Sequence, residues 1–236
     1  MARTNAISLL AGASTPATLA EIYGRVIENV QRLEEMGGTT AVVTPVFYAR
    51  HATQEETVRH FEEISKNTNA NLMIYNIPPF TGQNLTADTI IKISKIDKVI
   101  GVKDTSGNFP NFIKLLNYFK GSDFLVHQGA TNLAVPSMLM GADGYIPSLA
   151  PLFPQAHLKL YEYGKAGDIE NAMKWGAIVD EICKLYPMAK SQTASTKYAM
   201  STLGFVDKRV CQPTEPITEE EMKRIDAHIE KLRQYM

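Results

Sequence analysis

Two side chains at the ends of strand-like runs could form and process a Schiff base. Lys103 follows the apolar run Val99–Val102, and Tyr75 follows Leu72–Ile74. A lysine amine held away from water is unprotonated and attacks a carbonyl carbon, and a tyrosine hydroxyl nearby can carry protons to and from the carbinolamine. Two plainer interpretations stay open: a lysine that leaves the sheet for solvent or for Asp104, and a tyrosine that only lines the rim of the sheet.

Two further residues follow the next strand-like run. His127 could act as an acid or base, or could be a hydrogen-bonded core residue. Gly129 either lets the backbone approach a ligand closely or forms a simple turn. No metal and no organic cofactor are expected, because the sequence has no phosphate-binding glycine motif and its histidines lack metal-ligand spacing. These histidines are His51, His60, His127, His157 and His228.

The elements that must position these residues alternate between apolar strands and amphipathic helices. The expected strands are Ile7–Ala11, Thr39–Val43, Leu72–Tyr75, Val99–Lys103, Phe124–His127 and Gly144–Pro147. The expected helices between them are Ala17–Met36, one that begins at the capping box Thr53–Glu56, Thr86–Ile93, Asn111–Phe119 and Asn132–Met140. This alternation predicts an α/β fold with about six parallel strands, whose chemistry lies at the carboxyl ends of the strands.

The pattern changes after Pro154. Four helical stretches follow with no strand among them: Pro154–Ala166, Ile169–Leu185, Ser195–Leu203 and Thr218–Tyr235. No linker-like composition separates them from the preceding residues. We therefore expect residues 1–153 to form a partial (β/α) barrel and residues 154–236 to form a helical extension of the same domain.

Composition and charge exclude several classes of partner. The net charge of −1 gives no electrostatic reason to bind nucleic acid or an acidic membrane surface. The apolar run Ile7–Leu10 is too short for a signal peptide or a membrane span. Cys183 and Cys211 have neither metal nor redox spacing, which is typical of a reducing cytosol, so the expected location is cytoplasmic.

Three motifs carry a resemblance to a known family. They are Val43–Tyr48, which reads V-T-P-V-F-Y, Tyr75–Gly82, which reads Y-N-I-P-P-F-T-G, and Ile100–Gly107, which reads I-G-V-K-D-T-S-G. Together, and in this order, they resemble the dihydrodipicolinate synthase / N-acetylneuraminate lyase family over essentially the whole chain. The resemblance implies an eight-stranded barrel with a C-terminal helical extension. It also implies a class I aldolase or lyase that acts on pyruvate or another 2-oxo acid.

The resemblance also implies roles for single residues. Lys103 matches the Schiff-base lysine, Tyr75 matches the proton relay and Thr105 takes the place of an active-site threonine. Other matched positions line the substrate. These are Gly129, Ile146, Ser148, Phe80, and Phe47 with the adjacent Tyr48, at a place where the family often has a tyrosine contributed across a dimer interface.

Two departures from the family pattern bear on the substrate. Phe80 occupies the place where the synthases have an arginine that binds a second carboxylate. The acidic residues that sialic-acid lyases carry after the glycine matched by Gly129 are replaced by Ala130–Asn132, although Ser148 matches a lyase position. A lyase for another sugar-derived or aromatic 2-oxo acid fits this pattern better.

A third departure concerns the first part of the barrel. Two βα units and the G-T-T-G-E segment that holds the pyruvate carboxylate in the family have no counterpart here. Turnover could therefore be lost, and the alternative is a non-catalytic binding or assembly protein derived from the family. Six strands cannot close an eight-stranded barrel, so we expect homo-oligomers that cover the open sheet edges at Ile7 and Gly144.

Overall fold

The computed structural model describes residues 7–9, 19–47 and 51–235, with only the backbone described for residues 7–9 and 19–23. The chain divides into two compact units. The first contains Met1–Leu133 and Met140–Tyr145, and the second contains Ala134–Leu139 and Ile146–Met236. The expected boundary at residue 153 within a single domain stays a prediction.

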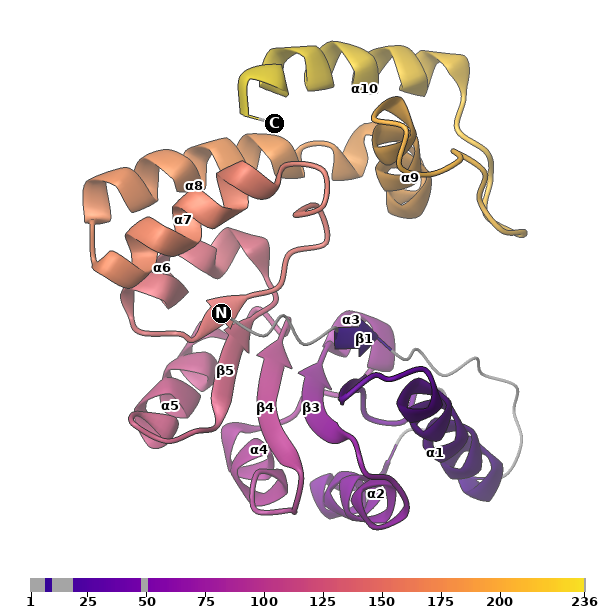
Figure 1. Cartoon of the computed structure of the whole chain (residues 1–236), viewed down its shortest axis with the longest axis vertical. Coiled ribbons are helices and arrows are strands. Elements are labelled where there is room, and N and C mark those ends of the chain that lie inside the picture. The colour runs from indigo at the N-terminus through magenta and orange to yellow at the C-terminus, as the bar shows by residue number, and fades with distance from the viewer. Residues whose placement is uncertain (1–6, 10–18, 48–50, 236) are drawn as a thin grey trace. The chain divides into compact units, whose positions relative to one another are not determined.

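A sheet of six parallel strands forms the centre of the first unit (Figure 1). The strands lie side by side in chain order, and each is paired in parallel with the next. They are β1 (Ile7–Leu9), β2 (Thr40–Val43), β3 (Asn71–Asn76), β4 (Val99–Asp104), β5 (Leu125–Gln128) and β6 (Gly144–Tyr145). The predicted parallel α/β sheet is confirmed. The last strand is shorter than expected, because it ends at Tyr145 rather than Pro147.

Helices connect these strands and follow one another along the outer side of the sheet (Figure 1). They are α1 (Leu19–Glu35), α2 (Gln54–Asn67), α3 (Pro78–Thr81), α4 (Ala87–Ile93), α5 (Phe109–Phe119) and the 3₁₀ turn η1 (Thr131–Leu133). The capping box predicted at Thr53 and Glu56 is present at the start of α2. The short helix α3 was not expected, and its first turn tolerates the two prolines because those positions need no backbone donor.

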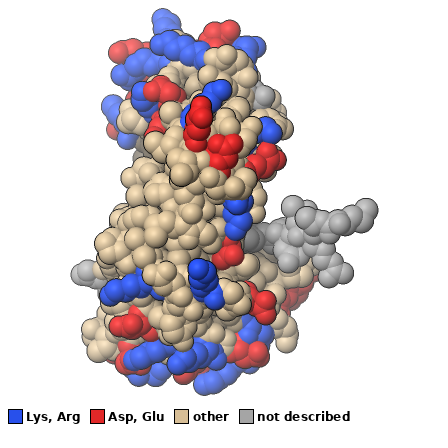
Figure 2. All heavy atoms as spheres, turned by 90° about the vertical axis from the view of Figure 1, so that its left-hand side faces the viewer, with Lys and Arg blue, Asp and Glu red and all other residues tan. Residues whose placement is uncertain are grey.

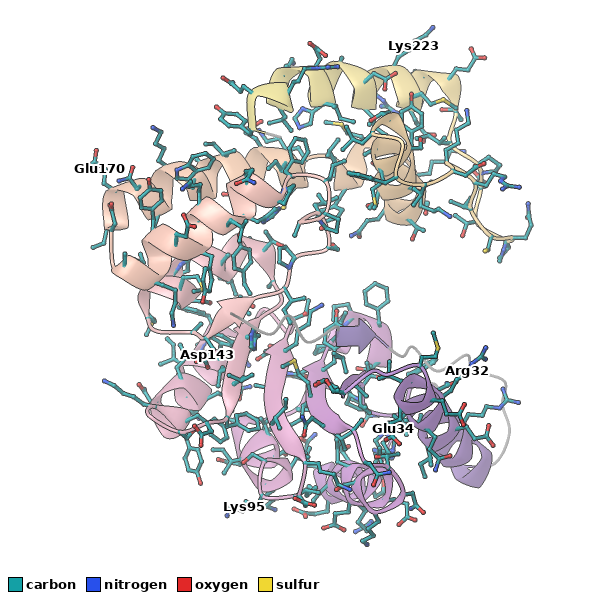
Figure 3. All side chains as sticks on the ribbon, in the orientation of Figure 1. Arg32, Glu34, Lys95, Asp143, Glu170 and Lys223 are labelled. Carbon is teal, nitrogen blue, oxygen red and sulfur yellow. The ribbon has the colours of Figure 1, made fainter. Side chains whose placement is uncertain are left out.

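The core of this unit lies between the sheet and the helices. Fully buried side chains from α2, α4 and α5 meet fully buried side chains from the strands: Phe61, Ile64, Ile90, Ile93, Phe112 and Leu115 on the helices, with Leu72, Ile74 and Val102 on the strands. Each such side chain contributes about 1.5–3 kcal/mol by leaving water. Polar contacts fix the connecting loops, for example where Glu34 at the end of α1 accepts hydrogen bonds from the backbone N–H groups of Asn69 and Ala70 (Figure 3).

The second unit is helical throughout its described residues. Its elements are α6 (Ala134–Leu139), α7 (Pro154–Ala166), α8 (Ile169–Cys183), η2 (Tyr186–Met188), α9 (Gln192–Thr202), α10 (Glu219–Leu232) and η3 (Arg233–Tyr235). All four predicted C-terminal helices are present. Gly167 ends α7 in a left-handed conformation with φ of 71°, which turns the chain directly into α8.

Small residues explain why α6 packs with α7 and α8. A Cβ atom at Gly164 would lie 2.5 Å from the Cβ atom of Met138, and one at Gly176 would lie 2.3 Å from a methyl group of Val135. Both glycines therefore let α6 approach the α7–α8 hairpin more closely than any larger residue would allow. None of the described helices has the length and apolar character needed to cross a membrane.

Charge on the surface follows the balanced composition. Figure 2 shows one face of the molecule, on which Lys and Arg are interspersed with Asp and Glu rather than gathered into a patch of one sign.

Candidate active site

Two rows of side chains cross the carboxyl ends of β3, β4 and β5. The strand register pairs Tyr75 with Lys103 and Lys103 with His127, and the next register pairs Asn76 with Asp104 and Asp104 with Gln128. Register partners in parallel strands point to the same face of a sheet, and successive residues point to opposite faces. We call the Tyr75–Lys103–His127 set the front row and the Asn76–Asp104–Gln128 set the back row.

The front row brings the two predicted chemical residues together. The Nζ atom of Lys103 lies 4.3 Å from the centre of the Tyr75 ring. Tyr75 is only 7% exposed, whereas Lys103 and His127 are half-buried. The Lys103 nitrogen therefore lies over the face of the tyrosine ring. Amine and phenol are thus neighbours on one face of the sheet.

The back row is a buried hydrogen-bond network. Asp104 accepts hydrogen bonds at Oδ1 from Asn76 Nδ2 at 3.2 Å and from the Ser106 backbone N–H at 2.8 Å. Asn76 also accepts at Oδ1 from the Leu85 backbone N–H at 3.1 Å. Burial raises the pKa of the Asp104 carboxyl, and its hydrogen bonds to Ser106 and Asn76 only partly oppose this shift. This network fixes the end of β4, and with it the backbone that carries Lys103.

Residues Asn76 and Asp104 were not predicted to act together. Both stand inside the family motifs, each directly after a residue assigned to the chemistry. The alternation of side chains along a strand was the available signal, because it places the residue after Lys103 on the helix side of the sheet.

Thr105 and Gly129 meet directly after β4 and β5. The Gly129 backbone N–H donates to the carbonyl oxygen of Asp104 at 2.7 Å. A Cβ atom at Gly129 would lie 2.0 Å from Thr105 Oγ1, so no larger residue fits there without movement. Thr105 Oγ1 is buried and has no hydrogen-bond partner among the described residues. Gly129 thus lets the Thr105 side chain approach closely, and an approach of its backbone to a ligand stays a prediction.

The aromatic positions of the motifs lie in different environments. Phe47 is half-buried in the loop after β2, and Tyr48 lies outside the described residues. Phe80, on α3 after β3, is 78% exposed. The loops that carry Phe47 and Phe80 are linked, because Gln83 Nε2 donates to the carbonyl oxygen of Val46.

Ile146 and Ser148 belong to the second unit. Ile146 is half-buried, and the exposed Ser148 shares a hydrogen bond with the hydroxyl of Tyr186. Burial raises the pKa of the Tyr186 hydroxyl, while the hydrogen bond to Ser148 opposes that shift. The tyrosine hydroxyl is therefore protonated at neutral pH and can share this hydrogen bond with the serine.

Two other histidines of the described chain, His60 and His157, are buried. His60 contacts the carbonyl oxygen of Thr44 through Nε2 at 3.3 Å, and burial lowers its pKa to about 3. Burial also lowers the pKa of His157 to about 4. Both imidazoles are neutral near pH 7. No group of three or more His, Cys, Asp or Glu side chains that could hold a metal ion occurs among residues 24–47 and 51–235, whose side chains the structure describes.

Comparisons of the sequence with known proteins all identify the same family. The sequence model of the "Dihydrodipicolinate synthetase family" matches residues 5–232. The 4-hydroxy-tetrahydrodipicolinate synthase of Chlorobaculum parvum is 29% identical over 207 residues, which cover 86% of this chain and 69% of the relative. The corresponding enzyme of Neisseria meningitidis is 30% identical over 195 residues, covering 82% of this chain and 66% of the relative.

Solved structures give the same result for the fold. Dihydrodipicolinate synthase from Bacteroides thetaiotaomicron superposes with a TM-score of 0.83 at 25% identity, covering 89% of this chain and 72% of that one. The synthase from Acinetobacter baumannii, solved in complex with pyruvate, superposes with a TM-score of 0.82 at 24% identity, covering 91% of this chain and 72% of that one. The chain thus matches about seven tenths of these proteins.

Proposed function

Because the chain belongs to the dihydrodipicolinate synthetase family, we propose that it carries a class I aldolase or lyase site in which Lys103 forms a Schiff base with a 2-oxo acid. The observation that supports this most strongly is the position of the Lys103 amine, 4.3 Å from the centre of the Tyr75 ring at the carboxyl ends of two paired strands. Active sites of parallel α/β barrels lie at this end of the strands.

The proposed reaction begins with the neutral amine of Lys103. Its nitrogen lone pair forms a bond to the C2 carbonyl carbon of the 2-oxo acid, and the carbonyl oxygen takes up a proton to give a carbinolamine. Loss of that hydroxyl as water gives the iminium ion. Tyr75 is the proposed proton carrier for both transfers, since its ring lies against the amine. The iminium then accepts the electron pair of the C3–C4 bond as that bond breaks, without any metal or organic cofactor.

The remaining predicted residues are proposed to contact the substrate. They are Thr105, Gly129, Phe47, Tyr48, Phe80, Ile146 and Ser148. The relatives in Chlorobaculum and Neisseria are named as 4-hydroxy-tetrahydrodipicolinate synthases, but an exposed phenyl ring at Phe80 cannot bind a second carboxylate as arginine can. We therefore propose a sugar-derived or aromatic 2-oxo acid, with pyruvate as the common product. The crystal structure of the Acinetobacter relative holds pyruvate itself.

Borohydride trapping tests the proposal. The full chain is incubated with pyruvate, reduced with sodium borohydride and digested for peptide mass spectrometry. We expect a reduced pyruvyl adduct on Lys103 that disappears in Lys103→Met. The matched control is Lys95→Met, which removes a lysine that points away from the sheet (Figure 3) and should leave the adduct in place. A folded sample with no adduct, or with adducts spread over surface lysines, would refute the proposal.

A self-association is also proposed. Strands β1 and β6 are the two ends of the described sheet, and apolar edge strands tend to pair with another chain. We propose that a second copy of the chain covers these edges, in a reducing cytosol in which Cys183 and Cys211 form no disulfide. Light scattering after size-exclusion chromatography measures the mass directly. A monodisperse monomer at micromolar concentration would rule this out.

A further inference from the structure

We propose that His127 is a second acid–base group of the lysine site, on the side of Lys103 opposite Tyr75. This inference rests on the proposed Schiff-base function of Lys103. In the register of the sheet, Lys103 has Tyr75 as its partner on β3 and His127 as its partner on β5. Neighbouring strands lie about 4.8 Å apart, so imidazole and amine leave the sheet from adjacent backbone positions on the same face.

The burial pattern of β5 supports a position open to a ligand. Val126 and Gln128 are buried, whereas Leu125 and His127 alternate with them and are half-buried. On the far side of His127 the register partner on β6 is Gly144, so β6 adds no side chain to the front row. The front face therefore carries a buried phenol, a half-buried amine and a half-buried imidazole on three successive strands.

His127 is less buried than His60 and His157. His60 and His157 are held neutral by burial, with pKa values lowered to about 3 and about 4. His60 is fully buried next to the end of β2, and His157 is buried on α7. Neither has the exposure that proton exchange with a substrate requires. His127 is half-buried rather than fully buried and is the register partner of Lys103. Imidazoles gain and lose protons between about pH 5 and 8.

The chemistry assigned to His127 is the transfer of one proton. In the cleavage direction the substrate is a 4-hydroxy-2-oxo acid bound to Lys103 as an iminium ion. The imidazole takes the proton of the 4-hydroxyl group as the C3–C4 bond breaks, the bonding electron pair moves to C3 to form the enamine, and an aldehyde leaves. The imidazolium then returns the proton to C3. Hydrolysis of the resulting iminium releases pyruvate and restores the amine, so charge and atoms balance.

The second half of this sequence can be measured with pyruvate alone. In D₂O, repeated enamine formation exchanges the methyl protons of pyruvate for deuterium, and proton NMR follows the loss of the methyl signal. We expect the exchange rate of the wild-type chain to rise as pH increases through the range in which imidazole loses its proton. In His127→Gln the rate should fall at least about 10²-fold and lose this pH dependence, the loss expected for a general base.

Two further variants separate this role from a structural one. His127→Glu restores a base that is deprotonated at lower pH, so exchange should recover in part and its rising limb should move to lower pH. His228→Gln, on α10, removes a histidine that contacts the carbonyl oxygen of Glu181 and should leave exchange unchanged. Borohydride trapping on Lys103 should persist in all three variants, because imine formation is assigned to Tyr75.

The possible outcomes are distinct. Persistent trapping with unchanged exchange and unchanged pH dependence in His127→Gln would overturn the role of His127 and leave the proposed function standing. Failure of the wild-type chain to trap pyruvate would overturn the proposed function, and the role of His127 with it, since no imine would exist. Loss of trapping in His127→Gln, with restoration of neither reaction in His127→Glu, would also overturn the acid–base role in favour of a structural one.

Discussion

The front and back rows use neighbouring residues of the same three strands for opposite purposes. In the back row, Asn76 and Asp104 are buried and bind each other and the backbone of the following loops. In the front row, Lys103 and His127 are half-buried, and the contact described for the amine is the face of the Tyr75 ring. The two rows are one residue apart along each strand. The back row is a buried hydrogen-bond network, and the front row holds the phenol, the amine and the imidazole.

The two rows differ because the two faces of the sheet contact different parts of the molecule. The back row faces the loop before α4, where Asn76 bonds to Asn84 and Leu85, and unpaired polar groups there would cost free energy. The front row lies on the opposite face of the sheet from α2, α4 and α5 (Figure 1), where water or a ligand can form hydrogen bonds with polar groups. Substitutions in the back row should therefore change stability, and substitutions in the front row should change reactivity.

Replacing the front-row phenol should have the largest effect. In Tyr75→Phe the ring and its contact with Lys103 remain, but the hydroxyl that carries protons is lost. We expect the rate of pyruvate trapping to fall about 10²- to 10⁴-fold, equivalent to about 3–5 kcal/mol in the barrier, with little change in the free energy of unfolding. Stopped-time borohydride trapping and urea denaturation measure the two quantities. Equal trapping rates in the two proteins would show that the proton carrier is another group.

The close approach of β4 and β5 should be the next most sensitive feature. A Cβ atom at Gly101 would lie 2.6 Å from the carbonyl oxygen of Leu125, a backbone atom that cannot move without disturbing the strand pair that aligns Lys103 with His127. We expect Gly101→Ala to destabilise the fold by about 3 kcal/mol. Gly24→Ala is the control, since Gly24 has no atom within 4 Å of its added Cβ and lies inside α1. That change should be neutral or stabilise by about 0.5–1 kcal/mol.

Loss of the Asn76 side-chain amide should destabilise the fold less than Gly101→Ala does and should leave Schiff-base formation at Lys103 intact. Asn76→Ala removes one of the two donors to Asp104 Oδ1, and it leaves the buried Leu85 backbone N–H without its acceptor. We expect a loss of about 2 kcal/mol in the free energy of unfolding, while Lys103 in the folded fraction still traps pyruvate. Asn84→Ala, at the exposed end of the same network, should cost less than half as much. A catalytic defect without a stability defect in Asn76→Ala would contradict the division between the rows.

Much of this arrangement could be predicted from the sequence, because it depends on local patterns. Apolar runs of strand length predicted the six strands, and the capping box at Thr53 predicted the start of α2; the structure contains both. The positions of Lys103 and Tyr75 at strand ends followed from those runs alone. The structure pairs them on neighbouring strands, and their chemical roles stay predictions.

What could not be predicted depends on long-range register and close packing. That Lys103 lies between Tyr75 and His127 depends on how β3, β4 and β5 align, and the β3–β4 alignment contains a shift at Leu72 and Met73 that no local pattern shows. The association of α6 with α7 and α8 depends on Gly164 and Gly176. Because these residues have no side chain, atoms of α6 can come close to the backbone of α7 and α8. The pairing of Asn76 with Asp104 is a contact across 28 residues of chain.

The buried carboxyl of Asp104 gives the smallest and most specific test of the comparison. Because burial raises its pKa, the folded state holds this proton more tightly than the unfolded chain does. The wild-type protein therefore loses stability from this group as pH rises from the ordinary value of about 3.8 through the raised value. Asp104→Asn keeps an acceptor at Oδ1 for Asn76 and Ser106 but has no proton to lose.

The variant should therefore match the wild type below pH 3.8 and become relatively more stable towards neutral pH, by no more than the roughly 0.5–1.5 kcal/mol of a single hydrogen-bond change. Urea denaturation across this pH range measures the difference, and Asp88→Asn, at an exposed carboxylate of α4, gives the background. A variant that becomes less stable than the wild type as pH rises would mean that the ionised carboxylate stabilises the back row. The back row would then be a charged network, and its contrast with the front row would rest on geometry alone.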